Sequence, residues 1–415
     1  MNGSNDVLAM IEGFLGNLPL GDHHPVRKMA VINLSRESFY KGSIASPAEA
    51  LNVAVSFIEE GADIIDLGAI STAPSSPSIG EDMEKERLLP SLKQILHNVD
   101  TDISVDTQNA NIAELALSLG AACINDVSGL VDPEMARTIA DHNSSVIIMA
   151  SKQYPGDLLS LDDIIRVLDQ RILNAVKAGI SIDKITIDPG VGKWVPEKTP
   201  EYDLAILDGY GRLRCLGRPI LVAISRKSFI GSVLNKPDPS ERLDGSLAAT
   251  AIAIYNGAHV VRTHDVFKSI EAIRIAQAIR GRSCRFTEDG IDIEILNKCG
   301  NEQELLVSLR MAGVEEKGMN ILSKKGSFRT LSISGISFQE AIIIKQEMLA
   351  RGGDAAIPKI ALQCDPQPEE IIVFGTLAQL FGLINSLRVQ PFRLPRIGKA
   401  IGETLNLIND PERYR

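Results

Sequence analysis

The sequence predicts an α/β protein: a (β/α)8 TIM barrel followed by a smaller α/β domain. Two observations support this. Short β-rich segments alternate with helical ones from residue 28 to residue 282, and there are eight of them. Eight βα units in about 250 residues is the size of this barrel. We therefore expect an N-terminal extension (1–27), a barrel (28–282) and a C-terminal α/β domain (283–415).

The eight expected barrel strands are short apolar runs, at residues 29–33, 63–67, 103–106, 123–126, 145–149, 184–188, 219–225 and 260–264. Continuous apolar runs such as 220–224 are typical of parallel strands buried on both faces. The segments between them, for example 47–60, 109–119 and 159–178, have helical periodicity. Gly61, Gly120, Gly179 and Gly257 follow these segments, where helices commonly stop. A doubly wound open sheet is the alternative, but no G-x-G-x-x-G motif follows the first strand.

The C-terminal domain has a different pattern. We expect strands at 284–295, 329–333 and 371–375, and helices at 302–311, 339–350, 377–387 and 398–408. Its segment KQEMLARGGDAAIP indicates no particular chemistry; Gly352 and Gly353 fit a helix stop, and Asp354 fits a turn.

Composition excludes several classes of function. The net charge is -10 and no block of Lys or Arg occurs, which argues against a nucleic-acid partner. No apolar run approaches the roughly 20 residues of a membrane helix, and the N-terminus does not resemble a signal peptide. The five cysteines are scattered and form no C-x-x-C pair, so we expect reduced cysteines in a cytoplasmic protein.

Polar residues close nearly every expected barrel strand, although a buried strand has no packing reason to end this way. They are Asn33, Asp66, Asp106, Asn125, Asp126, Asp188, Ser225, Arg226, Lys227, Arg262, His264 and Asp265. In a barrel these positions converge on the C-terminal mouth, where barrel active sites lie. Any single one could be a turn former or a helix cap. Their occurrence on seven strands favours a common site.

Two kinds of recognition can be read from this set. Arg226, Lys227, Arg262 and His264 place positive charge after the last two strands, which suits phosphate.

The acidic and amide residues suit a different ligand. A carboxylate such as Asp106 or Asp188 can accept two parallel N–H bonds from a planar heterocycle that has a 2-amino group beside a ring N–H. Asn125 can both donate and accept. Asn33 offers a carbonyl oxygen to Mg²⁺, which usually takes only one or two protein oxygens beside substrate phosphate.

Seven motifs in these positions resemble the dihydropteroate synthase family, along nearly the whole barrel. They are MAVINLSRESF, GADIIDLGAIST, ISVDT, GAACINDVSG, ITIDPGVG, LVAISRKSFIG and VVRTHDV. The resemblance implies a transferase of folate biosynthesis. It would condense (7,8-dihydropterin-6-yl)methyl diphosphate with p-aminobenzoate and release pyrophosphate. It also implies a homodimer.

The resemblance implies roles for individual residues. The pterin would be bound by Asp106, Asn125, Asp188 and Lys227. The diphosphate would be bound by Asn33, Thr72, Arg262 and His264, and its Mg²⁺ by Asn33. Lys227, Arg262 and a protonated His264 would assist the reaction, and Ser228 would face the arylamine.

Departures from the family pattern gather on the arylamine side. Ala73 stands where the family has arginine, and Lys193 and Trp194 stand where it has Phe-Gly-Lys, so that Trp194 is the candidate for the missing aromatic ring. The loop motifs resemble archaeal-type relatives. Some such organisms make methanopterin, whose arylamine is a ribofuranosyl-aminobenzene phosphate. The same reaction with this arylamine in place of p-aminobenzoate is therefore an alternative. The C-terminal segment resembles an extension on some longer bacterial synthases.

A second class of function remains as an alternative, namely a non-catalytic or methyl-transferring pterin-binding protein. Corrinoid-dependent methyltransferases share the barrel and the Asp/Asn/Asp set. They need no diphosphate-binding residues, so the motifs SRKSF and RTHD argue against them.

Overall fold

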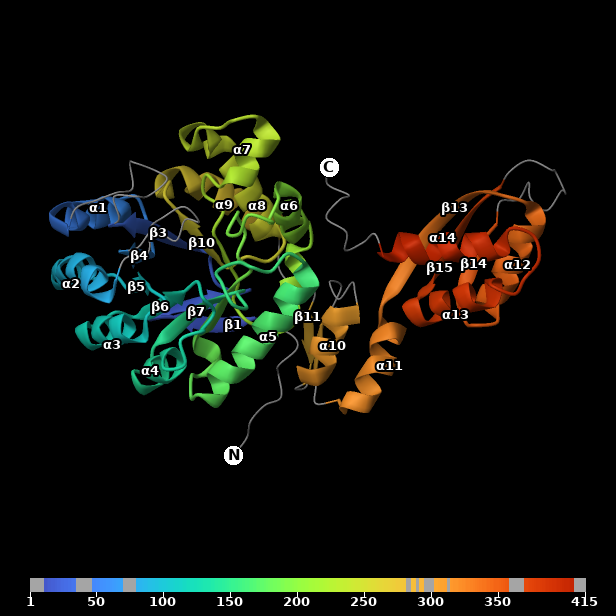
Figure 1. Cartoon of the computed structure of the whole chain (residues 1–415), viewed down its shortest axis with the longest axis horizontal. Helices are drawn as coiled ribbons and strands as arrows, with labels where there is room; N and C mark the ends of the chain where they lie inside the picture. The colour runs from blue at the N-terminus through green and yellow to red at the C-terminus, as the bar shows by residue number, and fades with distance from the viewer. Residues whose placement is uncertain are drawn as a thin grey trace. The chain divides into compact units, whose positions relative to one another are not determined.

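The structure is a computed structural model that describes residues 11–34, 47–69, 80–280, 285–288, 291–294, 302–311, 314–357 and 369–406. The chain divides into two compact units between Ile295 and Leu296 (Figure 1). The expected boundary at 282/283 therefore moves toward the C-terminus. The reason is that the expected strand 284–295 is a separate hairpin, β11 (Arg285–Glu288) with β12 (Ile291–Glu294), which groups with the first unit.

The first unit contains the expected barrel. Its eight strands run parallel in the order β8-β7-β6-β5-β4-β3-β10-β9. They are β3 (Arg27–Asn33), β4 (Ile64–Gly68), β5 (Ile103–Asp106), β6 (Cys123–Asp126), β7 (Ser145–Met149), β8 (Ile185–Asp188), β9 (Leu221–Val222) and β10 (Val260–Thr263). A parallel bridge between Ile187 and Ile220 joins the two ends of the sheet. The strand β9 is shorter than the apolar run 219–225 predicted.

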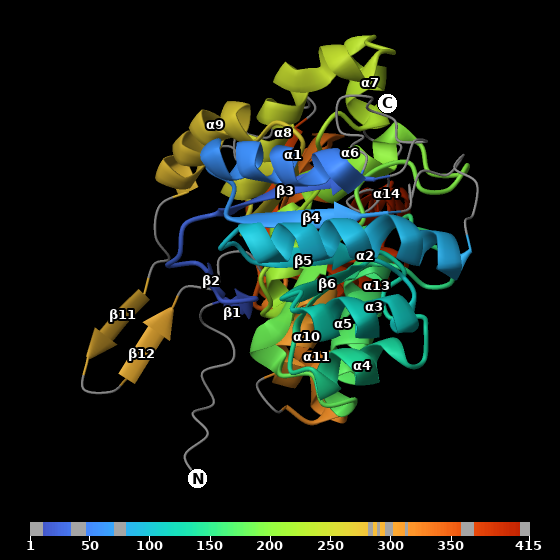
Figure 2. The ribbon, with the colours of Figure 1, turned by 90° about the vertical axis from the view of Figure 1, so that its left-hand side faces the viewer.

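Nine helices of the described chain surround these strands, and Figure 2 shows four of them, α1 to α4, side by side over β3 to β6. They are α1 (Pro47–Glu59), α2 (Glu81–Asn98), α3 (Ala110–Leu119), α4 (Met135–Asp141), α5 (Leu161–Lys177), α6 (Pro200–Asp208), α7 (Ser228–Leu234), α8 (Leu243–Tyr255) and α9 (Val266–Arg280). Local sequence sets their ends: Asn109 and Ser160 cap α3 and α5 through their side chains. The four predicted stop glycines all have positive φ, between 95° and 120°.

The expected N-terminal extension is partly integral to the barrel. Residues 12–21 form an antiparallel hairpin, β1 (Glu12–Leu15) with β2 (Leu18–Gly21). Leu15 and Leu20 are buried in one cluster with Met29, Ile64 and other residues of the barrel strands. The hairpin turn is bound as well, because Asn17 donates to the Asp102 carboxylate through its backbone N–H (2.7 Å) and its side chain (2.9 Å).

Asp22, which follows this hairpin, forms ion pairs with two residues from the C-terminal part of the barrel sequence. Its carboxylate accepts two hydrogen bonds from Arg214, at 2.8 and 2.7 Å, and it also pairs with Arg280 of α9. His259 Nε2 lies 3.3 Å from the same carboxylate. Despite the opposing effect of burial, His259 and Arg214 hold the pKa of Asp22 well below its usual range.

The second unit is a three-stranded antiparallel sheet, in the order β13-β15-β14, with helices packed on it. Its elements are α10 (Glu302–Met311), α11 (Glu316–Gly326), β13 (Phe328–Ile336), α12 (Phe338–Leu349), β14 (Asp354–Ala356), β15 (Glu369–Thr376), α13 (Leu377–Leu387) and α14 (Leu394–Asn406). Gly352 has a φ of 77° after α12, as its predicted role as a helix stop requires. Asp354 begins β14, where the sequence had indicated a turn. The helix α11 was not expected either. Within the described ranges, no helix is both long enough and apolar enough to cross a membrane.

Candidate active site at the C-terminal end of the barrel

Arg262 on β10 is the centre of an ion-pair network inside the barrel. Its Nε donates to Asp66 Oδ2 on β4 at 2.6 Å, and its Nη2 donates to Asp106 Oδ2 on β5 at 2.9 Å. Its remaining nitrogen, Nη1, donates no hydrogen bond to any of the described residues. The sequence grouped Arg262 with phosphate and Asp106 with a heterocycle; the structure shows that the two side chains touch.

Asn125 at the end of β6 joins the same network, because its Nδ2 donates to Asp66 Oδ2 at 3.1 Å. Asp66, Asp106 and Asn125 are all buried. The parallel register explains their proximity, since Asp66 pairs with Ser104 two residues before Asp106, and Asp106 pairs with Asn125.

Burial raises the pKa of Asp106 above its ordinary value, against the opposing charge of Arg262, and Asp66 raises it further. Burial also works against the charge of Arg262, but Asp66 and Asp106 outweigh it and raise the pKa of Arg262. The network therefore contains a permanent cation between two carboxyl groups. The ionised form of Asp106 is destabilised by its burial, so Asp106 takes up a proton more readily than an exposed aspartate does.

Asp188 and Lys227 form the second polar group, on β8 and directly before α7. Burial raises the pKa of Asp188, against the charge of Lys227. Burial lowers the pKa of Lys227 to about 8, against the charge of Asp188. Asp188 Oδ1 accepts a bond from Gly190 N at 2.8 Å, and Lys227 Nζ donates to Val191 O. A Cβ on Gly192 would lie 2.7 Å from Lys227 Cδ, so glycine makes room for this side chain.

The sequence analysis missed a buried ion pair beside these residues. Lys198 is 1% exposed, and its Nζ donates to Gly190 O at 2.6 Å and lies 3.4 Å from Asp203 Oδ1. Asp203 in turn accepts a bond from Gly192 N at 2.7 Å. Lys198 thus holds the loop that follows β8, whereas Lys193, the lysine of this loop that the sequence placed on the arylamine side, is exposed. The only signal in the sequence was a lysine just before the Thr-Pro start of α6.

His264 follows β10, and its Nδ1 lies 3.2 Å from Ser225 Oγ. Burial, and then the charge of Arg262, lower the pKa of His264 to about 4. The ring is therefore neutral near pH 7 in the protein without ligands. The protonated His264 that the sequence predicted for the reaction would therefore need an anion beside the ring to offset burial and the charge of Arg262.

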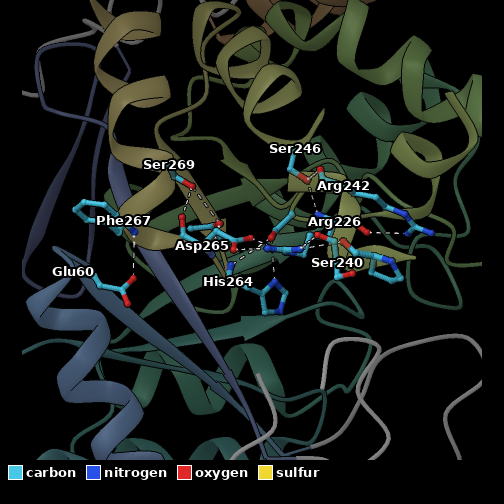
Figure 3. A network of polar contacts seen from close by, with 12 residues as sticks. Glu60, Arg226, Ser240, Arg242, Ser246, His264, Asp265, Phe267 and Ser269 are labelled. Atoms are coloured by element: carbon cyan, nitrogen blue, oxygen red, sulfur yellow. Dashed lines mark hydrogen bonds and ion pairs between the residues drawn. The ribbon is translucent and has the colours of Figure 1, made fainter. Parts of the chain in front are cut away.

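Arg226 does not take part in this group, contrary to the expectation that it supplies charge for phosphate. Its guanidinium donates to both Asp265 oxygens, at 2.8 and 2.6 Å, and to Ser240 O at 2.8 Å (Figure 3). Arg226 also has a φ of 58°, and Ser246 Oγ accepts its backbone N–H at 2.8 Å. It fixes the loop before α7 and so places Lys227.

Asp126 is likewise a loop former. Its Oδ1 accepts bonds from Ser128 N and Oγ, at 2.7 and 2.6 Å, and its Oδ2 accepts one from Leu130 N at 2.8 Å. The alternative reading of strand-end polar residues, as turn formers, holds for this position.

Of the expected arylamine-side residues, Lys193 and Trp194 lie in the loop after β8, and Ser228 is the first residue of α7. Trp194 Nε1 donates to Val191 O at 3.3 Å, and the Lys227 ammonium lies 5.2 Å from its ring centroid. The ring packs on Gly156, where a Cβ would come within 2.3 Å of it. Lys193 and Ser228 are exposed. Thr72 and Ala73 lie outside the described residues.

Asn33 is the last residue of β3 and pairs with Gly68 of β4. The described residues contain no group of three His, Cys, Asp or Glu side chains that could hold a metal ion. Asn33 could offer one amide oxygen to a cation whose other ligands would include phosphate oxygens of the substrate.

Comparison with known proteins agrees with this geometry. Residues 29–264 match the sequence pattern of the family described as pterin binding enzyme. The chain is 37% identical over 240 residues to the dihydropteroate synthase of Bacillus subtilis, a match that covers 57% of this chain and 83% of that protein. The chain belongs to the dihydropteroate synthase family. The residues that match the family pattern, 29–264, contain all eight barrel strands except the first two residues of β3.

Solved structures of dihydropteroate synthases share the fold. The Xanthomonas albilineans enzyme with 4-aminobenzoic acid has a TM-score of 0.59 and 31% identity, and the match covers 66% of this chain and 99% of that one. The Coxiella burnetii enzyme with pteroic acid has a TM-score of 0.59 and 33% identity, covering 65% and 99%. The family and the transferase class predicted from the motifs are confirmed.

Proposed function

We propose that the protein condenses (7,8-dihydropterin-6-yl)methyl diphosphate with p-aminobenzoate and releases pyrophosphate. One observation carries the proposal: Arg262 is bonded to Asp106 while its Nη1 has no acceptor among the described residues. A single side chain can thus contact the pterin-binding carboxylate and a phosphate oxygen. The related synthases, whose solved structures hold 4-aminobenzoic acid or pteroic acid, support the two organic substrates.

The buried polar residues would bind the pterin. Asp106 and Asp188 are carboxylates suited to the amino and ring N–H groups, and Asn125 suits an edge of mixed polarity. Lys227 adds a donor beside Asp188. Their burial excludes water from these bonds, which strengthens them.

In the reaction, the arylamine nitrogen forms a bond to the methylene carbon of the pterin while the bond from that carbon to the diphosphate oxygen breaks. The electron pair leaves with pyrophosphate, and the nitrogen loses one proton. The aniline nitrogen is nucleophilic without deprotonation, so no strong base is required. Arg262 and His264 would contact the departing oxygens, where negative charge builds up.

We propose Mg²⁺ as the cofactor, held by Asn33 together with diphosphate oxygens. When bound, it would supply charge that stabilises the leaving group. Arrival of the diphosphate would also raise the pKa of His264, so that His264 takes up a proton as the substrate binds.

The test is pyrophosphate release by the full chain with Mg²⁺ and the pterin diphosphate. One reaction contains p-aminobenzoate, and the other contains the ribofuranosyl-aminobenzene phosphate. We expect release with p-aminobenzoate and none after chelation of the metal. Release only with the ribosylated amine would show that the arylamine is wrong, and no release with either amine would refute the proposal.

A further inference from the structure

Asp66 on β4 has no assigned role, yet it contacts two residues proposed to bind the pterin or its diphosphate. Its side chain is fully buried. Arg262 Nε and Asn125 Nδ2 donate to the same carboxylate oxygen, Oδ2, at 2.6 and 3.1 Å. Its other oxygen, Oδ1, has no hydrogen-bond partner among the described residues.

The shared acceptor fixes the Asn125 amide. Because Nδ2 is bonded to Asp66, the carbonyl oxygen of Asn125 is turned away from Asp66. A buried amide without such a partner can rotate and exchange its donor and acceptor ends, which would invert the hydrogen-bond pattern offered to a heterocycle.

The same oxygen fixes Arg262. With Nε held by Asp66, the planar guanidinium directs Nη2 to a single oxygen of Asp106. Without Asp66, the guanidinium could turn and bond both oxygens of Asp106 side by side, which is the preferred geometry of an Arg–carboxylate pair. Asp106 would then have less capacity to accept bonds from a pterin.

Neutralising Arg262 does not explain Asp66, because Asp106 already pairs with that guanidinium. A second buried carboxylate adds a desolvation cost. The groups that act on Asp106 are Arg262 from β10, Asp66 from β4, Asp126 from β6 and Glu84 from α2, so three of these four are acidic. Asp66 therefore increases repulsion here. The orientation of two donors is a contribution that offsets this cost.

We propose that Asp66 is a positioning residue for pterin recognition, which sets the orientation of Arg262 and of the Asn125 amide before the pterin binds. The proposal rests on the function proposed above. It assigns Asp66 chiefly to recognition of the ring, because the orientation of the two donors decides which acceptors Asp106 and Asn125 offer to the pterin. Arg262 keeps its charge for the diphosphate without Asp66, so the two ligand parts can be tested separately.

The experiment measures the affinity of the full chain for two probes by calorimetry, 6-hydroxymethyl-7,8-dihydropterin and pyrophosphate with Mg²⁺. The variants are Asp66→Ala and Asp66→Asn. An asparagine oxygen in the place of Oδ2 keeps the acceptor, and its amide group takes the place of the unpartnered Oδ1. Asp102→Ala is the matched control, because Asp102 is a carboxylate that bonds the hairpin turn and not the site.

We expect Asp66→Ala to weaken pterin binding by about tenfold or more while pyrophosphate affinity stays within about threefold. Asp66→Asn should restore most of the pterin affinity. If Asp66→Ala does not fold, Asp66→Ser replaces it, because its hydroxyl is too short to reach both donors. The control should bind both probes as the wild type does.

Three results would overturn the inference: unchanged pterin affinity in Asp66→Ala, an equal loss for both probes, or an Asp66→Asn variant no better than Asp66→Ala. A wild-type protein that binds no pterin would instead overturn the proposed function, and the inference with it.

Discussion

The two sides of the barrel mouth are built differently. On the pterin side, Asp106, Asn125 and Asp188 are on strands and buried, and Arg262 is bonded to its neighbours. On the arylamine side, Lys193 is exposed in a loop after β8. The register of the parallel strands fixes the positions of Asp106 and Asn125 relative to each other. The position of Lys193 depends instead on contacts made by its loop. Recognition of the pterin would then depend on the strands of the fold, and recognition of the arylamine on loops, which vary more easily.

The largest expected effect on activity, and the first test of this contrast, is that of Arg262→Ala. The substitution removes the cation that joins Asp66 to Asp106 and that we propose to contact the diphosphate. We expect kcat/KM for the pterin diphosphate to fall by about 100-fold to 1000-fold. Steady-state pyrophosphate release measures this. A loss below about tenfold would mean that the strand-borne network does not dominate the reaction.

The next effect concerns the buried pair in the loop after β8. Lys198→Met leaves Asp203 buried without its cation, so we expect the free energy of unfolding to fall by about 3 kcal/mol. Denaturant unfolding measures it. The matched control is Lys193→Met, five positions earlier and exposed, which should change stability by less than about 0.5 kcal/mol. An equal loss of stability in the two variants would contradict the conclusion that Lys198, and not Lys193, holds this loop.

A third test uses pH. Below a pKa of about 8 the Lys227 amine is charged in the free protein, and above it the amine is neutral. If the ammonium binds the pterin, affinity should fall as pH rises beyond this value, by up to about tenfold per pH unit. Calorimetry from pH 6.5 to 9.5 measures the decline. The Lys227→Met variant should bind weakly at every pH without that decline, and an identical decline in both proteins would rule out Lys227.

Trp194 tests the arylamine side. Its ring packs on Gly156 and lies near the Lys227 ammonium. We expect Trp194→Ala to raise the KM for p-aminobenzoate by about threefold to tenfold, with pterin affinity changed by less than about twofold. Trp194→Phe should restore most of the loss. A larger effect on pterin affinity than on the KM for p-aminobenzoate would show that Trp194 does not belong to the arylamine side.

The smallest effect is expected at Lys193. An exposed cation can attract the arylamine carboxylate only weakly, so Lys193→Ala should raise the KM for p-aminobenzoate by about twofold at low salt. The difference should vanish at high ionic strength. A salt-independent effect would indicate a direct contact.

The sequence was sufficient to predict the strand-borne part of the site, because alternation of buried strands and helices defines the barrel, and the barrel brings the strand ends together. Asp106, Asn125 and Arg262 join one network for this reason, and Asp188 lies near enough for the charge of Arg262 to act on its pKa. The pattern could not separate ligand-binding residues from loop formers. Asp126 and Arg226 have the same local signature as the site residues, and only the partners, Ser128 and Asp265, distinguish them.

Lys198 could not be found from the sequence for a related reason. A buried lysine is unfavourable unless it is paired, so sequence patterns give it no preference over its exposed neighbour Lys193. Its pairing with Asp203 depends on how the loop after β8 folds back on α6, and loops carry no periodicity from which this could be read. The N-terminal hairpin was missed because β1 (EGFL) and β2 (LPLG) contain none of the β-branched residues that the equally short barrel strands contain.

The ion pair between Asp22 and Arg280 has a consequence for synthesis of the chain. The two residues are 258 positions apart. At about 5–20 residues per second, a ribosome needs roughly 13–52 s to make α9 after the hairpin has left it. During that time the two charged ends of the barrel cannot meet, so the hairpin's attachment through Arg280 belongs among the last folding events of the barrel.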